Sequence, residues 1–217
     1  MADEFKDVQV LAVQVHGPGV IHTAEKPVKS VSDLKGLKMR APTRIVNKLM
    51  ASLGATPVGM PLPSIPDALS KGTIQGAVIP WEVVPSVKVQ ELTKFHAEFD
   101  PAGGALYTTT FVMAMNKAKY NSLPADLKKI IDNNSGMATS AWLGKTQQAG
   151  DVAGRKSASD RGNTIFTVSP AEAQNFRRSS RALEIEWMED MNKRGFDGKK
   201  LLETAKALIE KHTKTTK

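Results

Sequence analysis

The chain has 217 residues, enough to bury a hydrophobic core in one large domain or two smaller ones. It contains no cysteine, which excludes disulfides and thiolate metal sites but leaves both a reducing cytosol and an exported location open. The net charge of +8 would suit a polyanionic partner, but the basic residues are scattered among acids, and the aromatic residues do not alternate with them. We therefore expect no nucleic-acid partner.

The first half of the chain alternates between strand and helix patterns. Short strands rich in apolar side chains are predicted at residues 8–15, 55–60 and 73–79, and a further short strand is predicted to end at residue 40. Helices are predicted between and after them, at residues 43–53, 64–70 and 80–92. This alternation is typical of the α/β class, in which helices cover the faces of a parallel or mixed sheet.

The second half is mainly helical. A long strand is predicted at residues 106–115, and a helical stripe at residues 124–158 is long enough to bridge two lobes. A short strand at residues 164–168 and helices at residues 170–192 and 199–211 follow, and the basic tail at residues 211–217 is expected to fray. Trp142 and Trp187 lie on helical stripes, so we expect both in the core.

Neither a membrane span nor a signal peptide is predicted. No stretch is long and apolar enough to cross a bilayer, and residues 1–6 are too polar and acidic for a signal peptide. Nothing in the sequence as written directs export.

Arg40 lies at the carboxyl end of a predicted strand and is followed by Pro42 and a helix. Ligands of open α/β sheets collect at this edge, and a guanidinium group matches a carboxylate or phosphate with two parallel hydrogen bonds. An exposed arginine paired with a neighbouring acid is the alternative that these residues leave open.

Trp81 and Glu82 follow the predicted strand at residues 73–79 and should lie at the same edge as Arg40. Two strand ends then meet at one crevice. Trp81 either contacts an apolar or aromatic ligand there or caps the core of its lobe.

The sequence contains no recognisable catalytic, cofactor or metal motif. The four histidines, at positions 16, 22, 96 and 212, are far apart and show no metal-binding spacing. No nucleophile elbow, Walker loop or dinucleotide-binding glycine motif occurs. We therefore expect no cofactor and no metal, and an α/β enzyme that acts on a small carboxylic acid, with Glu82 or His22 as base, is the minor alternative.

Five segments, in order, resemble the solute-binding subunit of tripartite ATP-independent periplasmic (TRAP) transporters, the DctP-type family. The segments are residues 33–40 (DLKGLKMR), 53–58 (LGATPV), 68–77 (ALSKGTIQGA), 115–117 (MNK) and 120–128 (YNSLPADLK). The resemblance covers nearly the whole chain. It implies an extracytoplasmic protein of the periplasm that is not an enzyme, captures a small organic acid and delivers it to the TRAP membrane permease subunits.

The resemblance also implies a two-lobed fold like that of periplasmic binding proteins, with crossing strands and a long spanning helix. Residues 1–17 would be a remnant of lobe one with the first crossing strand, and residues 18–105 would form lobe two. Residues 106–160 would supply the return crossing strand, part of lobe one and the spanning helix. Residues 161–217 would form C-terminal helices that pack on lobe two and the hinge.

The family's ligand arginine matches Arg40, so the resemblance implies that Arg40 forms a salt bridge to the ligand carboxylate. Val78 and Ile79 stand where the family often has acidic or amide side chains, and Gln75 replaces a common aspartate. We therefore predict an apolar or aromatic monocarboxylate and no cation site. The candidate ligand-binding residues are Arg40, Thr43, Ile79, Trp81, Thr109 and His22.

Family members begin with a signal peptide and with lobe-one elements that precede the segment matching residues 8–15. The resemblance thus implies that the N-terminal part of lobe one is missing here and that Met1 matches an interior position. We expect either an internal start or a truncated chain, and such a chain would bind ligand weakly or not at all.

Overall fold

The computed structural model describes residues 2–100 and 104–214. Met1 and residues 215–217, the end of the predicted basic tail, lie outside the described residues. No helix in the described part is both long and apolar enough to cross a membrane.

The main body is built on a six-stranded mixed sheet with strand order β4-β3-β5-β2-β6-β8. β3 is parallel to β4 and β5, β2 is antiparallel to β5 and β6, and β6 is parallel to β8. The strands are β2 (Val20–Thr23), β3 (Lys38–Ala41), β4 (Thr56–Gly59), β5 (Gly76–Ile79), β6 (Phe95–Phe99) and β8 (Thr164–Val168). The α/β class is confirmed.

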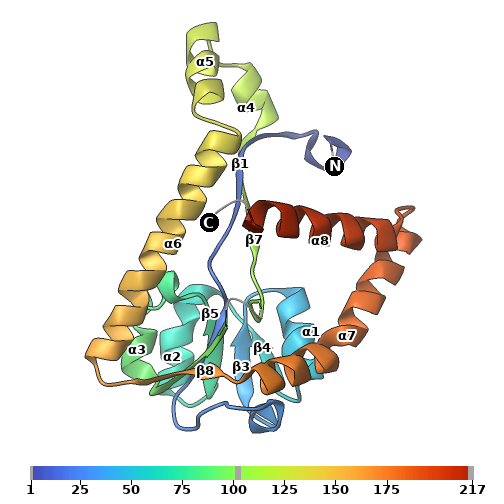
Figure 1. The fold of residues 1–217 in the computed structure, drawn as a ribbon. Helices are drawn as coiled ribbons and strands as arrows, with labels where there is room; N and C mark the ends of the chain where they lie inside the picture. Colours follow the sequence, from blue (N-terminus) through green and yellow to red (C-terminus); the bar gives the residue numbers. More distant parts are fainter. Residues whose placement is uncertain (1, 101–103, 215–217) are drawn as a thin grey trace.

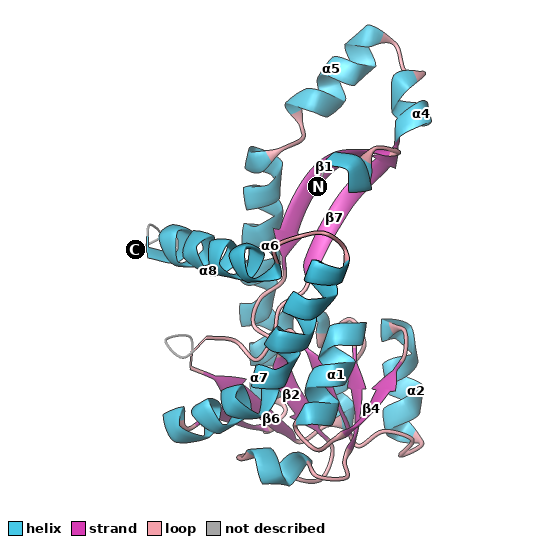
Figure 2. Cartoon of the chain, turned by 90° about the vertical axis from the view of Figure 1, so that its right-hand side faces the viewer, coloured by secondary structure: helices cyan, strands magenta, loops and turns pink. Residues whose placement is uncertain are grey.

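Side chains alternate along these strands between two hydrophobic clusters, one on each face of the sheet. Ile21 and Val78 belong to the cluster covered by α1 and α7, whereas Val20 and Ile79 belong to the one covered by α2, α3 and the end of α6. Figure 2 shows α1 and α7 in front of the sheet. These helices are α1 (Arg44–Ser52), α2 (Ile65–Ser70), α3 (Val89–Leu92), α6 (Met137–Asp160) and α7 (Pro170–Lys193).

A two-stranded antiparallel ribbon leads away from the main body. It pairs β1 (Val8–Val15) with β7 (Thr110–Asn116), so that Val15 lies opposite Thr110. The ribbon leads to α4 (Lys117–Asn121) and α5 (Ala125–Asn133), and α6 returns alongside it to the sheet (Figure 1). Strands and one long helix therefore connect two parts of the molecule.

The remaining elements are short or peripheral. α8 (Gly198–Lys214) packs against α7, where Lys206 Nζ donates to Glu184 Oε2 at 2.9 Å. Short 3-10 helices lie at Ala2–Phe5, Val31–Leu34, Leu62–Ser64 and Trp81–Val83.

Several predicted boundaries were wrong. The helix predicted at residues 80–92 is a short 3-10 helix, a series of turns and then α3, because Pro85 interrupts it and Lys88 has a φ of +52°. The stripe at residues 124–158 breaks between α5 and α6 at Gly136, whose φ is +83°. Trp142 is 64% exposed rather than in the core, since the first turns of α6 extend beyond the six-stranded sheet (Figure 1).

Candidate functional site

The candidate site is a hollow of about 280 Å³ between the carboxyl ends of β3 and β5 and the adjoining ends of β1 and β7. We call it the Arg40 hollow. It is lined by His16, Arg40, Pro42, Thr43, Leu62, Ile79, Pro80, Glu82, Val83, Tyr107, Thr109 and Phe111. β3 and β5 are parallel neighbours, with Arg40 opposite Ala77, so their ends meet here as predicted.

Arg40 supplies a buried positive charge to this hollow. Its side chain is 5% exposed, and its Nε donates to the carbonyl oxygen of Met60 at 3.2 Å. No carboxylate among the described residues forms an ion pair with it, and burial lowers its pKa. A buried charge without a partner is unfavourable, so this position suits an anion from outside the chain.

Three aromatic rings line one side of the hollow. The ring centres of His16 and Tyr107 are 5.3 Å apart in an edge-on arrangement, and those of His16 and Phe111 are 6.0 Å apart. Ile79 and Val83 add aliphatic surface. Flat rings beside aliphatic groups form walls that suit an apolar or aromatic ligand.

Two chain segments that are far apart in sequence meet beside the hollow. The N–H of Gly19 donates to the carbonyl oxygen of Tyr107 at 3.0 Å, and the Thr108 hydroxyl donates to the carbonyl oxygen of His16 at 2.8 Å. A Cβ at position 19 would lie 2.0 Å from the Tyr107 ring, so only glycine fits there. The Tyr107 hydroxyl donates to the carbonyl oxygen of Val78 at 3.0 Å, which fixes the ring against β5.

The polar groups of the hollow differ in whether they have a hydrogen-bond partner within the chain. Thr109 Oγ1 is buried and has no hydrogen-bond partner in the described part of the chain. Thr43 Oγ1 accepts the N–H of Val46 at 3.2 Å and so caps α1. His16 Nδ1 donates to the carbonyl oxygen of Gly17, and burial lowers the pKa of this imidazole.

Glu82 lines the hollow from the 3-10 helix at Trp81–Val83, which packs against α6. Its N–H donates to Asp151 Oδ1 at 2.9 Å. Burial raises the pKa of the Glu82 carboxyl, and the nearby charge of Asp151 raises it further.

Four predicted site residues, Arg40, Thr43, Ile79 and Thr109, line this hollow, and two do not. His22 is fully buried and lies in a cluster with Trp81 and His96: the His22 and His96 Nδ1 atoms are 2.7 Å apart, and the centre of the Trp81 ring lies 5.0 Å from that of each imidazole. Trp81 Nε1 donates to Glu98 Oε1 at 2.7 Å. In this structure His22 and Trp81 therefore belong to the core beneath the hollow.

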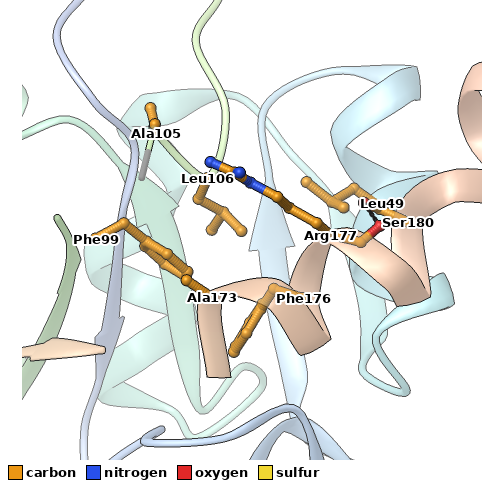
Figure 3. A pocket seen from close by; sticks show the side chains of 9 residues that line it. Leu49, Phe99, Ala105, Leu106, Ala173, Phe176, Arg177 and Ser180 are labelled. Carbon is orange, nitrogen blue, oxygen red and sulfur yellow. Dashed lines mark hydrogen bonds between the residues drawn. The ribbon is translucent and has the colours of Figure 1, made fainter. Parts of the chain in front are cut away.

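A second hollow lies between α7 and the segment that precedes β7. Figure 3 shows Arg177 extending over Leu106, with Phe99 and Phe176 below. Its volume is about 40 Å³. Because a bound water needs roughly 10–15 Å³, it has room for a few waters but not for an organic acid.

The fold and the Arg40 hollow together define an α/β protein of the binding-protein type, in which a ligand-sized site lies beside strands that cross between two parts. Residues 2–190 match the family model described as DctP, bacterial extracellular solute-binding protein, family 7. The chain therefore belongs to the DctP family of solute-binding proteins, as its motifs indicated. Members of this family act outside the cytoplasm.

Solved structures of TRAP solute-binding proteins share this fold. The chain is 67% identical to one from Rhodoferax ferrireducens T118 in complex with copurified benzoate, with a TM-score of 0.96 over 99% of this chain and 67% of that one. It is 48% identical to a marine metagenome protein specific for aromatic acid ligands, in complex with 3-hydroxybenzoate, with a TM-score of 0.92 over 97% of this chain and 65% of that one.

Among curated proteins, the chain is 25% identical over 206 residues to the outer membrane transporter protein TsaT of Comamonas testosteroni. That match covers 95% of this chain and 60% of TsaT. The chain thus spans about two thirds of the length of the solved relatives and 60% of this curated one.

Proposed function

We propose that the chain serves a TRAP transporter as its solute-binding component and captures an aromatic monocarboxylate, with Arg40 as the anchor for the carboxylate. The observation that carries this proposal is the Arg40 guanidinium, 5% exposed and without an acidic partner in the described residues, in a hollow walled by aromatic rings. The benzoate and 3-hydroxybenzoate bound by the two solved relatives support an aromatic acid.

In the proposed complex the ligand carboxylate pairs with the Arg40 guanidinium through two parallel hydrogen bonds. The Thr109 hydroxyl, which lacks a partner in the described chain, donates to the same carboxylate. The ligand ring packs between the aromatic wall and Ile79. Binding of this kind requires no catalysis, cofactor or metal.

Delivery depends on closure of the two parts around the ligand. We propose that residues 18–105 form lobe two, that residues 1–17 and 106–160 form the crossing and lobe-one part, and that residues 161–217 pack on lobe two and the hinge. Closure excludes water, which strengthens the ion pair at Arg40. The closed form would then be recognised by the permease subunits on the periplasmic side of the membrane.

Isothermal titration calorimetry tests this proposal. We expect benzoate to bind saturably, with a Kd of roughly millimolar or below, and glucuronate not to bind, because Ile79, Val83 and Phe111 offer no hydrogen bonds to a ring of hydroxyl groups. Arg40→Gln should weaken benzoate binding by about 30-fold or more, since loss of one partner of a buried charge pair costs about 2–5 kcal/mol. Arg44→Gln, which removes an exposed arginine from α1, is the matched control and should bind benzoate normally.

The other outcomes separate the alternatives. Binding of glucuronate without benzoate would reject the aromatic ligand. Conversion of a small carboxylic acid, followed by NMR of the ligand pool, would favour the α/β enzyme with Glu82 or His22 as base. Failure to bind any acid at millimolar concentration would favour a chain that does not bind by itself.

A further inference from the structure

Glu82 places a carboxylate in the same hollow as Arg40, and no described residue neutralises it. Its side chain forms no ion pair or hydrogen bond with any described residue. Arg40 and Glu82 do not pair with each other either, although both line the hollow. The hollow thus holds an unpaired cation and, separated from it, an unpaired acid.

The backbone around Glu82 is held firmly by α6. Asp151 Oδ1 accepts the Glu82 N–H at 2.9 Å. Two glycines of α6 allow the close approach: a Cβ at Gly150 would lie 2.9 Å from Glu82 Cβ, and a Cβ at Gly154 would lie 1.9 Å from the carbonyl oxygen of Trp81. A side chain that starts from so constrained a backbone is suited to recognising a ligand.

The surroundings of Glu82 disfavour a second anion. Burial raises the pKa of Glu82, and the charge of the nearby Asp151 carboxylate raises it further. His16 lies on the facing segment and interacts favourably with Asp151, but burial has the largest effect on its pKa and lowers it, so the imidazole is disfavoured as a counter-charge to the two acids. A ligand group that faces Glu82 must therefore donate a hydrogen bond or be apolar, and it cannot carry a negative charge without strong repulsion.

We propose that Glu82 selects the ligand within the aromatic acids, favouring a monocarboxylate whose ring carries a hydrogen-bond donor, such as a hydroxyl group, and excluding dicarboxylates. The carboxylate is held at Arg40, and the ring donor is held by the Glu82 side chain. This inference rests on the proposed function, because it takes Arg40 as the anchor.

Calorimetry with matched ligands tests the role of Glu82. The panel consists of benzoate, 3- and 4-hydroxybenzoate, the corresponding methoxybenzoates, isophthalate and terephthalate. We expect at least one hydroxybenzoate to bind about tenfold or more tightly than benzoate, the usual gain from a hydrogen bond to a charged group. Its methoxy counterpart, which lacks the donor, should show no gain. Both dicarboxylates should bind at least about tenfold more weakly than benzoate, because their second carboxylate is repelled by the carboxylate of Glu82.

Glu82→Gln should reduce both the preference for a hydroxybenzoate over benzoate and the discrimination against dicarboxylates. Because loss of a negative charge raises the affinity for every anion, the quantity to compare is the ratio of each Kd to that of benzoate. We expect the gain in affinity of the hydroxybenzoate over benzoate to fall below about threefold, because a neutral amide accepts a weaker hydrogen bond. The affinity of the two dicarboxylates relative to that of benzoate should rise as well. Glu25→Gln makes the same charge change at an exposed residue outside the hollow and should preserve both ratios.

The results distinguish this inference from the function on which it rests. If benzoate binds but no hydroxybenzoate gains over it, or if the gain persists in Glu82→Gln, the role of Glu82 is overturned and the proposed function stands. If benzoate does not bind at all, both the role of Glu82 and the proposed function are rejected. A urea unfolding curve for Glu82→Gln that matches that of the parent chain shows that the variant is folded.

Discussion

At the scale of single residues, the buried hydroxyl of Thr109 gives a test that separates stability from binding. Thr109 Oγ1 has no partner among the described residues, so Thr109→Val should raise the free energy of unfolding by up to about 1 kcal/mol. The same change should weaken benzoate binding about tenfold, because the carboxylate loses a donor. Urea unfolding and calorimetry measure the two effects.

Thr110→Val is the matched control for Thr109→Val. Thr110 is exposed and begins β7, next to Thr109 in sequence, so we expect little effect of its replacement on either quantity. Weaker binding by both variants would mean that the β7 strand end, rather than the Thr109 hydroxyl, is responsible.

The site residues were predictable only where a strand end alone determines position. Arg40 is the last residue but one of β3 and Ile79 ends β5. The ends of these parallel strands meet at one edge, so the sequence placed both residues at the crevice. Trp81 comes only two residues after Ile79 but turns into the core, and this direction depends on its contacts with His22 and His96. Tyr107 was missed because it reaches the hollow through a tertiary contact with Gly19, for which the local sequence carries no signal.

At the scale of elements, the contact of α6 with the 3-10 helix at Trp81–Val83 depends on the absence of a side chain at Gly154. A Cβ there would lie 1.9 Å from the carbonyl oxygen of Trp81, so Gly154→Ala forces the two elements apart. We expect a loss of about 1–3 kcal/mol in the free energy of unfolding, the usual effect of overpacking. Benzoate binding should weaken as well, because the displaced segment carries Glu82.

Gly144 provides the control on the same helix. A Cβ there meets nothing within 4 Å. Gly144→Ala should therefore raise the free energy of unfolding by about 0.5–1 kcal/mol through helix propensity alone. Equal destabilisation by both substitutions would contradict the proposed role of the contact at Gly154.

The elements themselves were predictable in proportion to their length and periodicity. The strand at residues 8–15 and the strand at residues 164–168 have the predicted bounds. α1 follows a clear apolar stripe, and α7 begins where the Ser169 hydroxyl accepts the N–H of Glu172. β2 and β6 were missed because their four and five residues include His22 and His96, which interrupt the apolar pattern although both are fully buried. Their strand pairing comes from neighbours that are distant in sequence.

At the scale of the whole molecule, a series of hydrogen-bonded side chains crosses the sheet from the turn before β8 to the site. Asn163 Nδ2 lies 2.9 Å from His96 Nε2, the two Nδ1 atoms of His96 and His22 are 2.7 Å apart, and His22 Nε2 lies 3.2 Å from the carbonyl oxygen of Ile79. Asn163 Nδ2 can only donate, sharing its two N–H groups among His96 Nε2 and the carbonyl oxygens of Gln90 and Thr93, and the carbonyl oxygen of Ile79 can only accept. His96 therefore carries its proton on Nδ1 and His22 on Nε2, so both rings must be neutral.

This series of hydrogen-bonded side chains predicts how the stability of the whole molecule responds to pH. Burial lowers the pKa of His96 to about 4 and that of His22 well below its usual value of 6.5. Above pH 6.5 neither state of the protein binds these protons. Below it the unfolded chain takes them up and the folded chain does not, so the free energy of unfolding falls as the pH falls toward the folded pKa values.

Between pH 7.5 and pH 5 each of these two histidines should lower the free energy of unfolding by about 2 kcal/mol. His16, whose pKa is also lowered, acts in the same direction, whereas Glu82 and Asp151, whose pKa values are raised, oppose the loss toward the lower end of this range. Urea unfolding at the two pH values measures the net change. His96→Gln should be less stable at pH 7.5 but should lose less stability on acidification. A loss on acidification as large in His96→Gln as in the parent chain would contradict the neutral pair, because a His96 that accepted a proton in the folded state would contribute nothing to that loss.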